Sequence, residues 1–146
     1  MRRADLDEVM AIEAASFEDP WPRQAFENDL ADPVLAFMRV AREDRRMLGY
    51  LVAWRVAGEI HLTNLAVDAA HRRGGVASGL VDALFAEARA VVAGTITLEV
   101  RRSNEAAIEL YRRRGFETAG IRKHYYQVGG EDALIMRVVL GEEGRP

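Results

Sequence analysis

Apolar positions in the first half of the chain change from helical spacing to strand-like runs. Two helical segments are predicted on either side of the proline-containing segment 19–22, with Leu6 and Phe26 among their inward positions. Three runs rich in apolar and β-branched residues follow, joined by short connections that favour antiparallel hairpins. These runs predict strands at 35–41, 47–56 and 59–67.

The second half of the chain alternates helical and strand-like patterns. A helix capped by Ser103 or Asn104 is expected to run to Arg114. Because the helix before it crosses between two strands, those two strands should be parallel. The whole pattern predicts an α/β fold, with a central mixed sheet, helices on both faces and a cleft between the two parallel strands. The other elements predicted here are a helix at 76–92 and strands at 95–100, 116–127 and 133–140.

A glycine-rich turn joins the strand at 59–67 to the helix at 76–92. Its sequence is Arg72-Arg73-Gly74-Gly75-Val76-Ala77. A helix N-terminus after such a turn presents free backbone N–H groups and the positive end of the helix dipole. Guanidinium groups add forked donors that match phosphate oxygens. The turn therefore predicts a site for a phosphate-bearing ligand.

Composition narrows the class of protein further. The chain has 146 residues, 49% of them hydrophobic, which suits one domain at 1–140 followed by a loose tail at 141–146. A net charge of −3 gives no support to nucleic-acid or membrane binding. Cysteine is absent, which excludes disulfides and thiol catalysis. With no signal peptide or membrane span in the pattern, we expect a cytoplasmic location.

Two common phosphate-binding fingerprints do not fit the turn. A Walker A loop needs Gly-Lys-Ser/Thr, and Lys123, the only lysine, lies far away. A dinucleotide fingerprint would need glycine at Val76, although Glu99 stands where a ribose-binding acid could. The three histidines show no ligand spacing, so no metal site is expected.

The pattern Arg72-x-x-Gly75-x-Ala77 resembles the loop of the GNAT superfamily of acetyl-CoA-dependent N-acetyltransferases. The order of predicted elements is also that of the superfamily, and the resemblance covers nearly the whole chain. It narrows to the RimI-type subfamily, most specifically through the block 98–116. Ala77 in place of the commoner glycine and Gly74 in place of a polar residue are departures from that pattern.

This resemblance implies acetyl-CoA as cosubstrate and no metal. Backbone groups of one strand would bind pantetheine as an added strand would, the turn would cradle the pyrophosphate, and Asn104 would contact CoA besides capping its helix. The expected cofactor-binding residues are Leu65, Ala66, Val67, Arg72, Arg73, Gly74, Gly75, Val76, Ala77, Ser78 and Asn104.

Acetyl transfer to an amine needs a base for the amine proton and an acid for the leaving thiolate. Glu99 ends a parallel strand beside the turn and is the candidate base, with burial raising its pKa or a water relaying the proton. Tyr111 follows on the next helix, and a phenol remains protonated at neutral pH. The resemblance assigns the same roles to Glu99 and Tyr111. A polar strand face and aromatic packing are the structural alternatives for these two residues.

The sequence predicts the amine substrate that accepts the acetyl group less directly than it predicts the cosubstrate. Trp21, Tyr125 and Tyr126 could wall a narrow peptide groove. The resemblance implies a peptide N-terminus, the N-terminal alanine of a small-subunit ribosomal protein. The alternatives are an acetyltransferase of a small amine or a lysine side chain, and a non-catalytic acyl-CoA-binding module. The joint presence of Glu99 and Tyr111 argues against the binding module.

Overall fold

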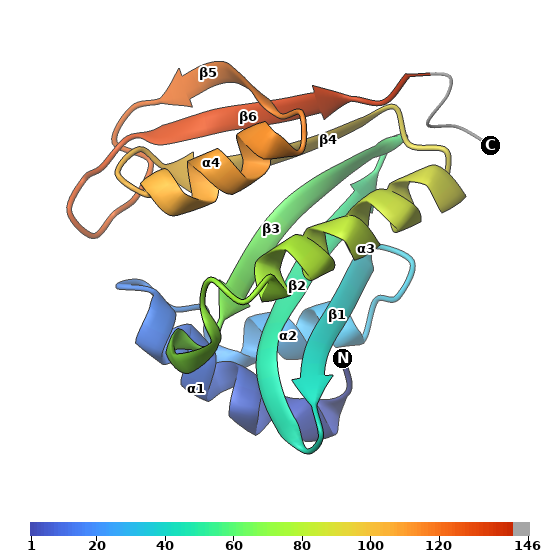
Figure 1. The fold of residues 1–146 in the computed structure, drawn as a ribbon, viewed down its shortest axis with the longest axis vertical. Helices are drawn as coiled ribbons and strands as arrows, with labels where there is room; N and C mark the ends of the chain where they lie inside the picture. The colour runs from blue at the N-terminus through green and yellow to red at the C-terminus, as the bar shows by residue number, and fades with distance from the viewer. Residues whose placement is uncertain (142–146) are drawn as a thin grey trace.

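A six-stranded mixed sheet forms the centre of the fold in the computed structural model, which describes residues 1–141 (Figure 1). The predicted loose tail lies, apart from Gly141, outside these described residues. The strand order is β1-β2-β3-β4-β6-β5, and only β3 and β4 pair in parallel. The strands are β1 (Ala36–Glu43), β2 (Arg46–Val56), β3 (Glu59–Val67), β4 (Thr95–Arg101), β5 (Glu117–Arg122) and β6 (Ala133–Val139).

Helices cover both faces of this sheet, as the sequence predicts. Two short 3₁₀ segments accompany them, η1 (Arg3–Asp5) and η2 (Ala69–His71). One core packs under α1 and α2, and a second core packs under α3 and α4. The predicted fold class is therefore confirmed. The helices are α1 (Leu6–Ser16), α2 (Arg23–Leu30), α3 (Val76–Ala90) and α4 (Glu105–Arg113).

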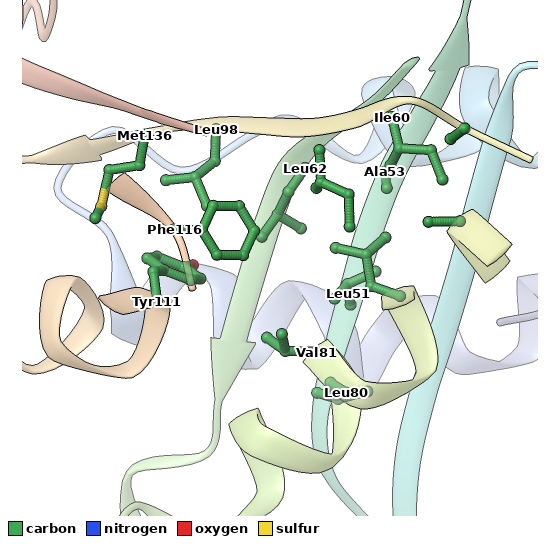
Figure 2. Packing of buried hydrophobic residues seen from close by; sticks show 14 of the residues in the cluster. Leu51, Ala53, Ile60, Leu62, Leu80, Val81, Leu98, Tyr111, Phe116 and Met136 are labelled. Carbon is green, nitrogen blue, oxygen red and sulfur yellow. The ribbon is translucent and has the colours of Figure 1, made fainter. Parts of the chain in front are cut away.

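The core under α3 and α4 joins the two halves of the sheet. Leu62 of β3 and Leu98 of β4 belong to the same buried cluster as Val81 of α3 (Figure 2). Phe116 and Tyr111 close the same core beneath α4. Each large apolar side chain buried in this way contributes about 1.5–3 kcal/mol. This packing holds β3 and β4 together at their N-terminal ends.

Beyond that core, β3 and β4 separate. They pair only from Glu59 opposite Thr95 to Leu62 opposite Leu98. Further along, β3 stays with β2 and β4 stays with β6, so the sheet opens into two arms (Figure 1). The two parallel strands thus separate where the cleft between them was predicted.

A bulge in β3 coincides with the start of the opening. Val52 lies opposite Asn64 and Ala53 opposite Leu62, which leaves Thr63 as an extra residue. The extra residue changes the face of the strand, because Leu62 packs under α3 while Asn64 reaches α1. Bulges of this kind redirect side chains next to functional sites.

The predicted strand at 116–127 is longer than β5, which ends at Arg122. His124 has a φ of 53°, in the left-handed region, and its backbone N–H donates to the carboxylate of Asp132 at 2.9 Å. Tyr126 donates its N–H to the carbonyl of Glu131 at 3.2 Å. Residues 123–132 therefore form a loop stabilised by its own hydrogen bonds, and the ladder with β6 ends before it.

Candidate active site

The glycine-rich turn exposes the first backbone N–H groups of α3. Gly75 precedes α3 with a φ of 84°, a conformation that favours glycine. The N–H of Gly79 is the first of the helix to be bonded, to the carbonyl of Gly75 at 3.0 Å. The N–H groups of residues 76–78 precede that bond and have no partner within residues 1–141. This helix end can therefore bind an anion such as a pyrophosphate.

The two arginines of the turn have different surroundings. Arg72 lies back against β3, with its Nε donating to the carbonyl of Val67 at 3.2 Å and its Nη2 reaching Oγ of Ser16 at 3.5 Å. Arg73 is exposed, and no carboxylate within residues 1–141 pairs with it. Arg72 thus braces the turn, whereas the guanidinium of Arg73 is available to a phosphate group.

Gly49 of β2 allows α3 to begin close to the sheet. A Cβ at this position would lie 2.7 Å from the carbonyl oxygen of Ala66 and 3.3 Å from Cγ1 of Val76. A side chain here would clash with the backbone of β3 at Ala66 and crowd Val76 at the start of α3. The sequence gives no signal for this glycine, because the need for it arises from a contact between distant segments.

Alternate residues of β3 present their backbone groups to the opening. The N–H of Asp68 donates to the carbonyl of Leu48 at 2.8 Å, and hydrogen-bonded pairs alternate along an antiparallel ladder. Ala66 therefore bonds toward Tyr50 of β2, whereas Leu65 and Val67 direct their backbone groups to the outer edge. Of the three predicted cofactor residues on β3, Leu65 and Val67 can form ladder-type bonds to an extended ligand.

Glu99 lies at the opening, on the face of β4 that also carries Thr97. Its side chain is 14% exposed, and its Oε2 lies 2.5 Å from Nε2 of His61 on β3. Its Oε1 lies 3.7 Å from Nε of Arg122. The hydrogen bond from His61 holds the pKa of Glu99 below its usual range and outweighs the opposite effect of burial. Of the two expectations for this base, a pKa raised overall is therefore wrong, whereas proton relay through a water stays a prediction.

His61 is the partner of Glu99 that the sequence analysis missed. The parallel register places His61 opposite Thr97, so its side chain shares a face with Glu99 two residues further along β4. None of the three histidines has a ligand at short sequence spacing, so the sequence alone does not single out His61. The predicted parallel pairing of 59–67 with 95–100 is the feature that could have indicated a contact between His61 and Glu99.

Tyr111 approaches from the opposite face of the sheet. It projects from α4 into the core, with its ring centroid 5.5 Å from that of Phe116 (Figure 2). Burial raises the pKa of Tyr111, and the nearby phenol of Tyr126 raises it further. Its hydroxyl therefore keeps its proton at neutral pH and can donate it.

Tyr125 and Tyr126 lie beside Glu99 in the loop that follows β5. Their rings pack edge to face with centroids 5.1 Å apart. Burial raises the pKa of Tyr126 to about 12, and both Tyr125 and Glu99 add to this effect. Tyr126 therefore lies near both predicted catalytic residues, Glu99 and Tyr111.

Arg101 joins the two loops that border this region. Its Cζ lies 4.1 Å from the centroid of the Tyr126 ring, a cation–π contact. Its Nη2 lies 3.3 Å from Oδ1 of Asp19 in the α1–α2 loop, and its Nη1 lies 3.4 Å from Oε1 of Glu131 in the β5–β6 loop. Arg101 therefore brings together the two segments that were predicted to wall a groove.

Trp21, the third predicted acceptor residue, is held in the α1–α2 loop. Its backbone N–H donates to Oε2 of Glu13 at 2.9 Å, and its ring lies 5.3 Å from that of Phe26. Glu13 also accepts from Nδ2 of Asn64 at 2.9 Å and from the hydroxyl of Tyr50. The buried carboxylate of Glu13 thus fixes the loop that carries Trp21. The helical pattern of α1 does not predict this role for Glu13.

Asn104 caps α4, as its residue type predicts. Its Oδ1 accepts from the backbone N–H of Ala107 at 3.2 Å. The neighbouring Ser103 directs its N–H to Oε2 of Glu131 at 2.6 Å instead. The amide oxygen of Asn104 thus accepts one bond from the helix, and its NH₂ group remains available to a ligand.

No metal-binding group and no membrane span are found in the part of the chain that the structure describes. Among residues 1–141 no three His, Asp or Glu side chains gather as metal ligands. No helix within that range is long and apolar enough to cross a bilayer.

Comparison with known proteins identifies the class to which this fold and site belong. Residues 6–116 match the acetyltransferase (GNAT) family. The chain is 36% identical to the N-alpha-acetyltransferase RimI of Mycobacterium tuberculosis over 148 residues, covering 97% of this chain and 91% of the relative. It is 34% identical to the Escherichia coli ribosomal protein bS18-alanine N-acetyltransferase over 142 residues, covering 96% and 95% of the two chains.

The structural comparison agrees with these matches. A crystal structure of the Escherichia coli enzyme of that name superimposes with a TM-score of 0.87 at 32% identity, covering 97% of this chain and 94% of the other. The chain therefore belongs to the acetyltransferase (GNAT) family and is an acyltransferase of the RimI type. The predicted family and enzyme class are confirmed.

Proposed function

We propose that this chain is a cytoplasmic, acetyl-CoA-dependent N-terminal protein acetyltransferase. Its substrate would be the N-terminal alanine of a small-subunit ribosomal protein, the substrate class in the name of the Escherichia coli relative. Residues 1–140 would form its single catalytic domain. The observation that carries the proposal is the position of Glu99. Its carboxylate lies at the point where β3 and β4 separate, beside the loop of Tyr125 and Tyr126.

The cosubstrate would bind along β3 and the turn that follows it. The unbonded N–H groups of residues 76–78 and the exposed guanidinium of Arg73 suit the pyrophosphate. The outer-edge backbone groups of Leu65 and Val67 suit the amides of pantetheine. This arrangement would place the thioester at the opening of the sheet, and no metal is needed for the chemistry that follows.

Transfer would proceed by direct attack of the acceptor amine. The amine nitrogen forms a bond to the thioester carbonyl carbon, and its proton passes to the carboxylate of Glu99, directly or through a water. The carbon–sulfur bond then breaks, and the thiolate takes the phenolic proton of Tyr111. Because burial raises the pKa of Tyr111, that proton is present at neutral pH.

An N-terminal amine suits a base of this strength. An α-amine with a pKa near 8 is on the order of 10% neutral at pH 7, whereas lysine is below about 0.1%. The pairing with His61 lowers the pKa of Glu99, so this carboxylate is a weaker base than burial alone would make it. A weakly basic carboxylate is sufficient for the first amine and poorly matched to the second.

The test is a thiol-release assay with acetyl-CoA and two short peptides. One peptide begins Ala-Arg with a free N-terminus, and the other is N-terminally blocked and contains a lysine. We expect turnover only with the free N-terminus. Turnover with the blocked peptide would instead identify a lysine acetyltransferase. Binding of CoA without turnover on either peptide would favour a small-amine acceptor or a binding module.

A further inference from the structure

The contact between His61 and Glu99 gives the proposed base a partner that can change its own charge. Nε2 of His61 and Oε2 of Glu99 are 2.5 Å apart. Glu99 is the first residue of β4 beyond the last pair of the two parallel strands. An ionised carboxylate only accepts hydrogen bonds, so Nε2 must carry the proton in this contact. That leaves Nδ1 of His61 as the nitrogen that can take up a second proton.

We infer that His61 is a positioning residue for Glu99, and that proton uptake by its imidazole turns the acetyl transfer off; this inference rests on the proposed function. With a neutral imidazole, one N–H holds Oε2 of Glu99 in place, while Oε1, 3.7 Å from Nε of Arg122, keeps a lone pair for a substrate proton. Protonation at Nδ1 adds a full positive charge beside the carboxylate. The carboxylate then becomes a poorer acceptor for the amine proton.

The other groups around the pair keep their charge as the pH falls from 8 to 5.5. Arg122 of β5 lies 3.7 Å from Oε1 of Glu99 and is permanently charged. Tyr125 and Tyr126 face the same carboxylate, and burial raises the pKa of each phenol, so both stay neutral. Trp54 of β2 lies opposite His61 and does not titrate. Histidine is the side chain whose charge ordinarily changes between about pH 5 and 8.

A pair of variants separates positioning from mere packing. His61→Gln keeps an N–H donor for Glu99 but cannot take up a proton, whereas His61→Leu removes the donor. At pH 8 we expect kcat of His61→Gln to stay within about threefold of wild type and kcat of His61→Leu to fall about tenfold. The KM for acetyl-CoA should not change in either variant.

The decisive readout is the ratio of the His61→Gln rate to the wild-type rate as a function of pH. Titration of the substrate amine cancels in this ratio. We expect the ratio to rise as the pH falls from 8 to 5.5, because only wild type loses activity through imidazole protonation. The matched control is His71→Gln, which removes the other histidine–carboxylate pair, with Asp68 at 2.8 Å. Its ratio to wild type should not depend on pH.

Two outcomes would overturn the inference while leaving the proposed function in place. One is a flat pH ratio for His61→Gln, and the other is full kcat in His61→Leu. A wild type that acetylates no amine would instead overturn the proposed function itself.

The pair can also be tested without any assay of activity. Ring ¹⁵N NMR of wild type should show His61 protonated at Nε2 at pH 8. Glu99→Gln should shift the Nε2 signal of His61 and leave those of His71 and His124 unchanged. An unchanged His61 signal in Glu99→Gln would show that the contact is absent in solution, and the inference would fail.

Discussion

Two carboxylates on the α1–α2 face of the sheet have different surroundings. Glu13 is 1% exposed and accepts from the hydroxyl of Tyr50, the amide of Asn64 and the backbone N–H of Trp21. Glu99 has one close donor, from His61, and a more distant guanidinium. Glu13 connects two strands and a loop, whereas Glu99 faces an opening between two strands.

This difference separates a structural carboxylate from one that can do chemistry. Three fixed donors bond to the carboxylate of Glu13. Replacing this residue should lower the free energy of unfolding, because each buried donor would lose its acceptor. The carboxylate of Glu99 keeps capacity to accept a proton from a substrate. The same contrast holds for two tyrosines. The hydroxyl of Tyr50 is bonded to Glu13, whereas that of Tyr111 makes no hydrogen bond to another residue within 1–141.

The largest expected effect is on stability, at Glu13. Glu13→Gln places an amide NH₂ among three donors, which should lower the free energy of unfolding by about 3 kcal/mol. Urea unfolding followed by circular dichroism measures this change. Glu109→Gln is the control, since Glu109 is an exposed partner of Arg113 at 3.0 Å and should cost less than about 0.5 kcal/mol. A Glu13→Gln variant within about 1 kcal/mol of wild type would remove the distinction between the two carboxylates.

The second comparison replaces two buried tyrosines. Tyr111→Phe keeps the ring packing and loses the phenolic proton, so kcat should fall about 100-fold with little loss of stability. Tyr50→Phe should instead destabilise the protein by about 2 kcal/mol, because Glu13 loses a donor. Steady-state kinetics and urea unfolding of both variants test this contrast. Full activity in Tyr111→Phe would exclude Tyr111 as the general acid.

A smaller effect is expected where the two loops meet. Arg101→Gln loses the charged contacts to Asp19 and Glu131 and the cation–π contact with Tyr126. The KM for the acceptor peptide should rise about fivefold, equivalent to about 1 kcal/mol, with kcat within about twofold. Peptide-dependent initial rates at saturating acetyl-CoA measure both constants. An unchanged KM would show that these loops do not border the acceptor.

The smallest effect concerns pH and stability at Glu99. Because its pKa is lowered in the folded state, Glu99 stabilises the fold above its unfolded pKa of about 4.3, and that contribution is lost as pH falls further. The difference in unfolding free energy between wild type and Glu99→Gln should be below about 1 kcal/mol at pH 7 and shrink from pH 5 to pH 3. A difference that grows on acidification would contradict the lowered pKa.

Local patterns were enough to predict most of the fold. Periodicity placed the helices and strands, and the crossover between 59–67 and 95–100 predicted the parallel pair. The turn at Arg72–Ala77 followed from its glycines and its position before a helix. These features depend on residues close together in the sequence, where period and turn chemistry act directly.

The parts of the site that were missed depend on contacts between distant segments. His61 meets Glu99 only because two strands pair in a particular register. Glu13 meets Asn64 only because the bulge at Thr63 changes the face of β3. The lowered pKa of Glu99 follows from the first of these contacts. A sequence pattern does not specify strand register or the position of a bulge. Burial was therefore the only influence on the pKa of this carboxylate that the sequence could indicate.

The most direct measurement of the central claim is kcat of Glu99→Gln with an Ala-Arg peptide, beside its free energy of unfolding. We expect kcat to fall about 100-fold, the KM for acetyl-CoA to remain within about threefold of wild type, and stability to change by less than about 1 kcal/mol. A Glu99→Gln enzyme that turns over at the wild-type rate would contradict the account, because the carboxylate at the opening would then have no part in removing the amine proton.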